Sequence, residues 1–144
     1  MRRLIIMILP ACLALMLGTG TAMADITGQI DADIPFQFHI GNTTLPAGKY
    51  IFHMMNGSDL MIMTVRSADN KFGQEFLVRT ALAPTIPKHS EIIFKRYGHE
   101  EFLRRFFQGG AQTGAAVDES SREESRLQKK GVKGLTHSQP VHKE

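Results

Sequence analysis

Between residues 34 and 66 the chain alternates short apolar runs with turn-forming residues, a pattern that predicts β-strands. In the first run, Phe36, Phe38 and Ile40 alternate with polar or small residues, as in a strand with one buried face. Two more apolar runs follow, and the segments between the runs contain the proline, glycine and asparagine that favour turns. We therefore expect strands at 36–40, 49–55 and 60–66.

A tight turn at Gly57-Ser58 would join the second and third runs as a hairpin in which Met54 pairs with Met61. In that register one face of the hairpin is wholly apolar and the other nearly so. Strands that are apolar on both faces are covered on both, so we place this hairpin centrally, inside a sandwich or closed barrel. The first face holds Tyr50, Phe52, Met54, Met61, Met63 and Val65; the second holds Ile51, His53, Met55, Leu60, Ile62 and Thr64.

Further strands are expected downstream of this hairpin. One strand is predicted at 74–81, and a second hairpin at 91–97 and 102–107 would place Lys95 opposite Arg104. The fold class predicted is all-β, a small antiparallel sandwich or barrel of about six to seven strands, followed by a short C-terminal helix or a disordered tail.

The N-terminus has the features of an export signal. Arg2 and Arg3 precede an apolar segment at 4–17, and Ala22-Met23-Ala24 fits a small-residue cleavage site. The apolar segment is short for a membrane span. A cleaved signal at 1–24 is therefore expected, with a periplasmic or extracellular product; an uncleaved anchor, lipid attachment at Cys12 and twin-arginine export are the alternatives.

After the signal, the composition divides the chain into a β domain at 25–110 and a polar tail at 111–144. The tail contains a possible short helix at 118–130 whose terminal charges suit the helix dipole. Leu127 is almost its only apolar residue, so the helix has no stripe to bury and is expected only if something holds it. Residues from about 131 onward are expected to be disordered.

Charge and cysteine content restrict the partners. Loss of Arg2 and Arg3 reduces the 17 basic residues to 15, against 14 acidic residues, a net charge of +1. This balance supplies no broad positive field for nucleic acid, and membrane contact is expected only through the cleaved segment. Cys12 is the only cysteine, so the mature chain is expected to form no disulfide.

An ordered set of short motifs runs through the predicted strands. The segments are Ile34-Pro35-Phe36-Gln37-Phe38, Leu45-Pro46-Ala47-Gly48-Lys49-Tyr50, Arg66-Ser67-Ala68-Asp69, Phe94-Lys95-Arg96-Tyr97-Gly98 and Phe102-Leu103. The set resembles a group of small uncharacterised exported bacterial β-domain proteins over about residues 32–107. The resemblance implies a secreted β domain, and it implies no activity or site residue.

Soft metal ligands are the first candidate chemistry. His53 and Met55, with nearby methionines, are the thioether and imidazole types that bind copper(I). The predicted register puts His53 and Met55 on one face and Met54 on the other, which favours core packing over copper binding. His39 could lie opposite His53 and supply a second imidazole, but a zinc site needs a third ligand that the pattern does not indicate.

Basic residues among aromatic residues are the second candidate chemistry: Arg79, Lys95, Arg96, Arg104 and Arg105. Such a set on strands would bind an anionic glycan or a single-stranded nucleic acid. Export argues against nucleic acid. The alternative is that positive charge protects exposed edge strands, and we favour that interpretation from the sequence.

Catalytic motifs are missing from the sequence, which has no Gly-x-Ser-x-Gly elbow and no carboxylate pair spaced to face one cleft. The leading hypothesis is an exported, non-catalytic β domain without a cofactor, with a binding or structural role in the envelope and an envelope protein or anionic glycan as partner. The alternatives are a copper carrier using His53 and the methionines, and an anionic-glycan binder using Arg79, Lys95 and Arg104.

Overall fold

Ten β-strands and one helix make up the part of the chain that the computed structural model describes, residues 28–56, 61–117 and 121–141. The expected signal at 1–24 lies outside these residues. Among the residues described, no helix is both long and apolar enough to cross a membrane. The elements are β1 (Gln29–Ile34), β2 (Phe38–Ile40), β3 (Thr43–Leu45), β4 (Gly48–Asn56), β5 (Met61–Ser67), β6 (Gly73–Leu82), β7 (Glu91–Tyr97), β8 (Glu100–Phe107), β9 (Thr113–Val117), α1 (Arg122–Lys129) and β10 (Gly134–Pro140).

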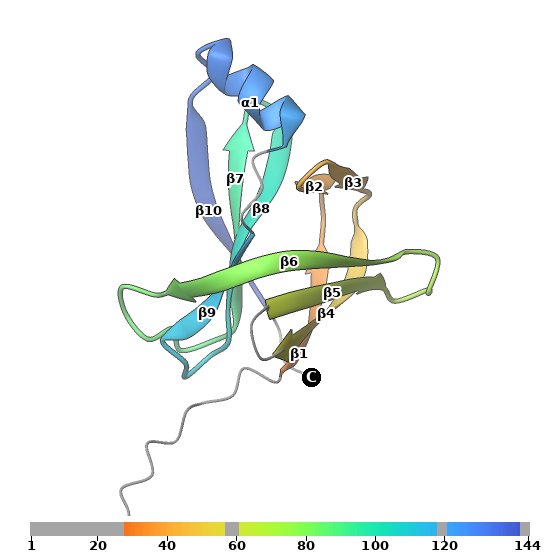
Figure 1. The fold of residues 1–144 in the computed structure, drawn as a ribbon, viewed down its shortest axis with the longest axis vertical. Coiled ribbons are helices and arrows are strands. Elements are labelled where there is room, and N and C mark those ends of the chain that lie inside the picture. Colours follow the sequence, from red (N-terminus) through yellow and green to blue (C-terminus); the bar gives the residue numbers. More distant parts are fainter. Residues whose placement is uncertain (1–27, 57–60, 118–120, 142–144) are drawn as a thin grey trace, which may run out of the picture.

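The strands form a single connected sheet that does not close into a barrel. The main path runs β1-β4-β5-β6-β9-β8-β2-β3, and β7 joins it by pairing with β8 on one side and β10 on the other. Figure 1 shows β6 crossing over the β7, β8 and β10 strands, with β5 and β4 beside it, so the sheet folds over itself in a sandwich-like manner. The all-β prediction is confirmed, with ten strands in place of six or seven and without barrel closure.

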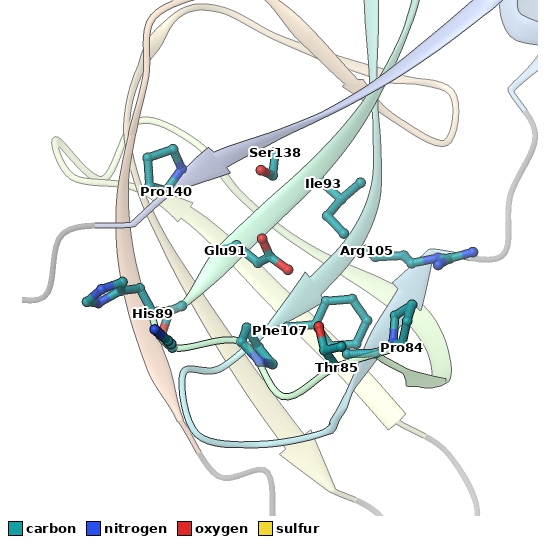
Figure 2. A pocket seen from close by; sticks show the side chains of 13 residues that line it. Pro84, Thr85, His89, Glu91, Ile93, Arg105, Phe107, Ser138 and Pro140 are labelled. Atoms are coloured by element: carbon teal, nitrogen blue, oxygen red, sulfur yellow. The ribbon is translucent and has the colours of Figure 1, made fainter.

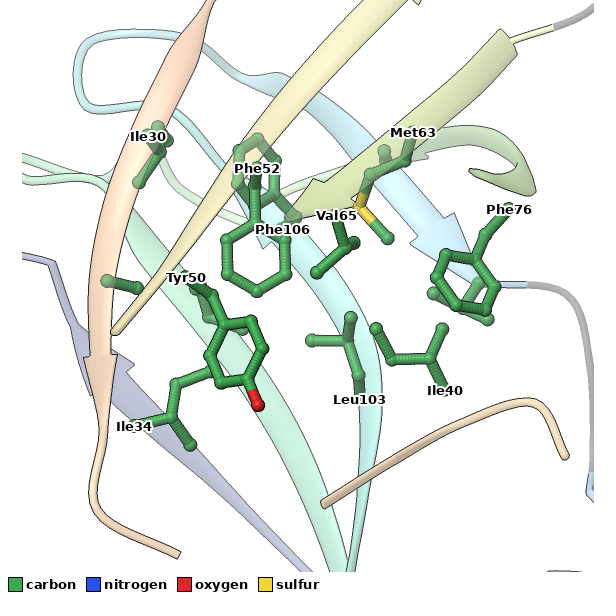
Figure 3. Close-up of a cluster of buried hydrophobic side chains, with 14 of the residues drawn as sticks. Ile30, Ile34, Ile40, Tyr50, Phe52, Met63, Val65, Phe76, Leu103 and Phe106 are labelled. Atoms are coloured by element: carbon green, nitrogen blue, oxygen red, sulfur yellow. The ribbon is translucent and has the colours of Figure 1, made fainter. Parts of the chain in front are cut away.

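The core lies between the two crossing parts of the sheet. Figure 3 shows Phe52, Met63 and Val65 from the first hairpin facing Leu103 and Phe106 from β8. All five side chains are buried, and burying one such side chain contributes about 1.5–3 kcal/mol to stability. The alternation read from the sequence therefore identifies this core face.

The first hairpin has a register two residues away from the predicted one: Met54 pairs with Met63 and Phe52 with Val65. A shift of two keeps every side chain on its expected face, since side chains alternate with a period of two. The apolar face is therefore buried as predicted. The predicted turn lies mostly at 57–60, outside the described residues.

The second face of this hairpin corrects the prediction of two-sided cover. Met55 is 40% exposed, His53 is exposed, and Ile51 and Ile62 are only half-buried. Because the sheet encloses one core on one side, no other described element covers the outer face of β4 and β5. The hairpin is therefore covered on one face only, and not on both faces as its composition predicted.

The second hairpin closes earlier than predicted. Tyr97 pairs with Glu100 across a two-residue connection, and Gly98 takes the positive φ of 64° that such tight hairpins require. Lys95 therefore lies opposite Phe102, and the predicted Lys95–Arg104 pairing is wrong.

The C-terminal region contributes strands as well as a helix. β9 pairs with β6 and β8, and β10 pairs along its whole length with β7. The expected disorder is therefore wrong for Gly134–Pro140, whereas residues 142–144 lie outside the described part of the chain. β10 has no clear alternation of apolar residues, and Leu135 is 60% exposed. Hydrogen bonding to the open edge of β7 and the stacking of His137 on Phe94 hold it, and neither is visible in an apolar pattern.

Candidate functional site

Four basic side chains line one hollow on the outer face of the sheet, which we name the basic hollow. It has a volume of about 370 Å³. Its lining residues are Arg79, Ile93, Lys95, Arg104, Arg105, Ala116, Val117 and Thr136. None of these described lining residues is acidic, so the hollow concentrates positive charge on a chain whose net charge is +3.

The sheet register brings residues distant in the sequence into this hollow. Arg79 on β6 pairs with Ala116 on β9, and Ala116 also pairs with Arg105 on β8. Arg105 pairs in turn with Ile93 on β7. The small side chain of Ala116 separates the two arginines in one row across the sheet, and the floor of the hollow is formed there.

A β-bulge lets two consecutive arginines line the same hollow. Ile93 pairs with Arg105 but Phe94 pairs with Leu103, which leaves Arg104 as an extra residue in β8. In a regular strand, neighbouring side chains point to opposite faces. The bulge re-aims one of them, so both arginines leave the core while Leu103 and Phe106 enter it.

Burial and nearby charges shift the pKa of two ionisable groups around the hollow. Burial would raise the pKa of Tyr97, but the hydrogen bonds from Lys95 and Gln128 and the charges of Lys95 and Arg104 outweigh burial and lower it. Burial lowers the pKa of Arg104. The ammonium of Lys95 lies 5.2 Å from the centre of the Tyr97 ring, within the range of a cation–π contact.

One carboxylate from α1 reaches the border of the hollow. Glu124 is completely buried and forms an ion pair with Arg104. One of its oxygens also accepts a hydrogen bond from Gln128 (3.3 Å), while the other has no hydrogen-bond partner among the described residues. Gln128 also donates to the Tyr97 hydroxyl (3.0 Å). Glu124 therefore offsets the charge of Arg104 at the border of the hollow.

Arg96 is the one predicted basic residue that the structure places elsewhere. It lies on β7 between Lys95 and Tyr97, points to the opposite face, and its Nε is 3.8 Å from a carboxylate oxygen of Glu101. The other four predicted residues, Arg79, Lys95, Arg104 and Arg105, come together.

A second hollow adjoins the first and was not predicted from the sequence; we name it the proline hollow (Figure 2). It has a volume of about 350 Å³ and lies between the connection 83–90, β7, β8 and β10. It shares Ile93 and Arg105 with the basic hollow. Pro84 and Pro87 are typical of a connection between strands, but the wall contributed by β10 has no signal in the sequence.

The aromatic residues that lie among the basic ones in the sequence offer no stacking surface. Their exposed fractions are 0% for Phe94, 3% for Tyr97, 2% for Phe102 and Phe106, and 1% for Phe107. Basic and aromatic residues are interleaved in the sequence because neighbouring residues of a strand point to opposite faces, and because β8 contains the bulge. A single-stranded nucleic acid requires exposed rings, so this surface does not suit one.

The candidate metal ligands lie apart. Met54 and Met63 face each other in the core, whereas His53 and Met55 lie on the outer face of β4. His39 pairs with Thr44, so the two histidines do not lie opposite each other. Within the described ranges, no group of three or more His, Cys, Asp or Glu side chains is placed to hold a metal ion.

Two histidine–carboxylate contacts at the second hairpin were not anticipated. The Nε2 of His39 lies 2.6 Å from Glu100, and its Nδ1 lies 3.0 Å from the Thr44 hydroxyl. His137 contacts the neighbouring Glu101 at 2.7 Å. The first contact ties β2 to β8 and the second ties β10 to β8. Neither hollow is lined by these residues, so we assign the contacts to the fold.

No protein-family model, curated protein sequence or solved structure matches the chain. Its fold and its hollows therefore define the class of protein: an all-β domain with a basic hollow on the outer face of its sheet.

Proposed function

We propose that the protein is an exported, non-catalytic β domain that binds an anionic ligand in the basic hollow. The observation that carries the proposal is the convergence of Arg79, Lys95, Arg104 and Arg105 on one hollow with no acidic lining residue among those described. Hydrogen bonds to charged groups contribute about 1.5–3 kcal/mol each, so a ligand that meets several of these cations would bind usefully. Export is inferred from the N-terminal pattern.

Protection of sheet edges, the interpretation that the sequence favoured, does not account for these residues. Edge strands carry unpaired backbone groups through which two chains can pair and aggregate. Positive charge on an edge strand hinders that pairing. β6 lies between β5 and β9, β7 between β8 and β10, and β8 pairs with β9, β2 and β7. All four basic residues therefore lie on interior strands, where an edge-protecting charge has no purpose.

An acidic glycan suits this hollow better than the other anionic polymers. Nucleic acid is disfavoured because the aromatic rings are buried and because the chain has little net charge. Acidic glycans present isolated carboxylates or sulfates, which arginine binds in a bidentate manner. Such polymers are also accessible to an exported protein.

Retention on an immobilised acidic polysaccharide tests the proposal. We expect the mature chain to be retained at low salt and eluted by added salt, because the contacts are ionic. Arg105→Glu should elute at clearly lower salt, since it reverses one of the four charges of the hollow.

Arg66→Glu is the matched control, because Arg66 is also an exposed arginine within a strand but lies outside the hollow. It makes the same change in net charge, so it should elute close to the unaltered chain. Absence of retention, or equal shifts for the two variants, would overturn the proposal.

A further inference from the structure

We propose that the basic hollow is one end of an extended site, and that the proline hollow binds the next sugar unit of an acidic oligosaccharide. The inference rests on the proposed anion binding and adds the length of the ligand and the order of its sugar units. The two hollows together are named the trough. They share Ile93 and Arg105 as lining residues, so they meet over β7 and β8.

The trough is longer than a single sugar ring. Along β7 it extends from Lys95 in the basic hollow to Glu91 in the proline hollow. Four residues of a strand span about 13 Å. β10 follows the same course beside it, with Thr136 opposite Lys95 and Ser138 opposite Ile93. A ligand that fills the trough therefore has more than one unit.

The two ends of the trough differ in chemistry. The basic hollow presents cations without a lining carboxylate among the described residues, whereas the proline hollow contains both Lys88 and Glu91 together with the hydroxyl side chains of Thr85 and Ser138. A second anionic group would meet Glu91 there. A neutral unit rich in hydroxyl or amide groups fits better, so we infer a glycan in which acidic and neutral sugars alternate.

The wall of the proline hollow is fixed in place by the backbone. Ala83 N–H donates to Gln112 O (2.9 Å), Gly110 N–H to Pro87 O (2.8 Å) and Gly109 N–H to the Ser90 hydroxyl (3.1 Å). These bonds tie the connection 83–90 to the connection between β8 and β9. A wall that is already ordered lowers the entropy cost of binding.

An extended acidic peptide fits the trough less well than a glycan. Peptides that bind in extended form add a strand to a free sheet edge through backbone hydrogen bonds. The floor of the trough is a row of paired residues, Arg79, Ala116, Arg105, Ile93 and Ser138, across five strands. Ladder pairing occupies the backbone there, so recognition must come from side chains, as it does for sugars.

Calorimetric titration of the mature chain with glucuronate, and then with hyaluronan oligosaccharides that alternate glucuronate with a neutral N-acetylated sugar, tests the inference. We expect the oligosaccharide to bind about tenfold or more tightly than the monosaccharide, the gain that one or two added hydrogen bonds provide. Oligogalacturonate of the same length, which is acidic at every unit, should show a smaller gain.

Ser138→Trp and Thr85→Trp place a bulky ring in the proline hollow from two different elements, and both positions are exposed. Each variant should bind the oligosaccharide no more tightly than glucuronate, while its affinity for glucuronate itself stays unchanged. Thr64→Trp, on the outer face of β5 and away from the trough, is the control and should retain both affinities. Two independent positions keep the test valid if one variant fails to fold.

The outcomes separate this inference from the proposed function. Equal binding of glucuronate and the oligosaccharide would overturn the extended site and leave anion binding intact. If polyglutamate gained as much affinity with length as hyaluronan does, the assignment to a glycan would be overturned. Failure of every anion to bind would overturn the proposed function itself.

Discussion

A single extra residue in β8 decides where two arginine side chains point. Without the bulge at Arg104, regular alternation from Leu103 would place Arg105 on the core face and Phe106 on the outer face. A buried, unpaired guanidinium there would be costly, so the bulge both protects the core and supplies the basic hollow with a second cation from the same strand. Bulges are frequent next to binding sites, and this one has that role in the proposed function.

Asp69, in the turn after β5, provides a test of electrostatics at a single residue. The hydrogen bonds from the Ser67 hydroxyl (2.6 Å) and the Lys71 backbone N–H (3.2 Å) lower its pKa from 3.8 to about 2. Because the folded pKa is the lower one, the carboxylate stabilises the fold above pH 3.8, and this contribution is lost as the pH falls to about 2.

Asp69→Asn should therefore be less stable than the unaltered chain at neutral pH, and the difference should shrink as the pH falls below 3.8 toward about 2. Urea denaturation of both chains across that range measures it. A difference that stays constant with pH would contradict the assignment.

The residue types of the candidate site could be read from the sequence, but their partners could not. Arg79, Lys95, Arg104 and Arg105 attract notice because basic residues lie among aromatic ones. Their convergence depends on β9 lying between β6 and β8, a topology that no local pattern encodes. The bulge likewise has no signature in the alternation. Lys95 was wrongly placed opposite Arg104 because the turn at Gly98-His99 is two residues shorter than expected.

Polar contacts hold α1, the only helix among the described residues, against the sheet. Ser121 caps its start by accepting a hydrogen bond from the Glu124 backbone N–H (2.9 Å). The backbone N–H of Arg122 donates to Asn42 (2.9 Å), and the buried Glu124 side chain pairs with Arg104. From the sequence, a helix without an apolar stripe was expected only if other contacts hold it. These polar groups supply those contacts.

Glu124→Gln tests this account of α1. It removes the charge that pairs with Arg104, so we expect a loss of about 1–3 kcal/mol in the free energy of unfolding and faster amide exchange across Arg122–Lys129. Glu123→Gln, which disrupts only the exposed pair with Arg126 (3.3 Å), should cost about 0.2–0.5 kcal/mol. Equal exchange rates in the two variants would show that the helix is held by other contacts.

The strands that the sequence missed are short or polar. β3 has only three residues, and β10 has no buried apolar run, since Gly134–Pro140 is mostly polar and partly exposed. Strands with a clear apolar alternation, such as β4, β5 and β6, were predicted correctly. The missed strands are held by pairing with an existing sheet edge, so they form without an apolar alternation that the sequence would show.

At the scale of the whole molecule, one folded sheet separates two tasks. Its inner face encloses the core between crossing sets of strands (Figure 1). Its outer face carries the trough over β6, β9, β8, β7 and β10. The near-zero net charge of the expected mature chain hides this arrangement. A local concentration of charge, and not the total, supports the proposed anion binding.

The most direct test of the central claim maps where an anion binds. In a nuclear magnetic resonance titration of the mature chain with an acidic oligosaccharide, we expect the largest amide shifts to cluster at Arg79, Lys95, Arg105 and Ala116. The same titration of Arg105→Glu should reduce those shifts at equal ligand concentration. Shifts centred on the exposed face of β4 and β5, or scattered over surface lysines and unchanged in the variant, would contradict it.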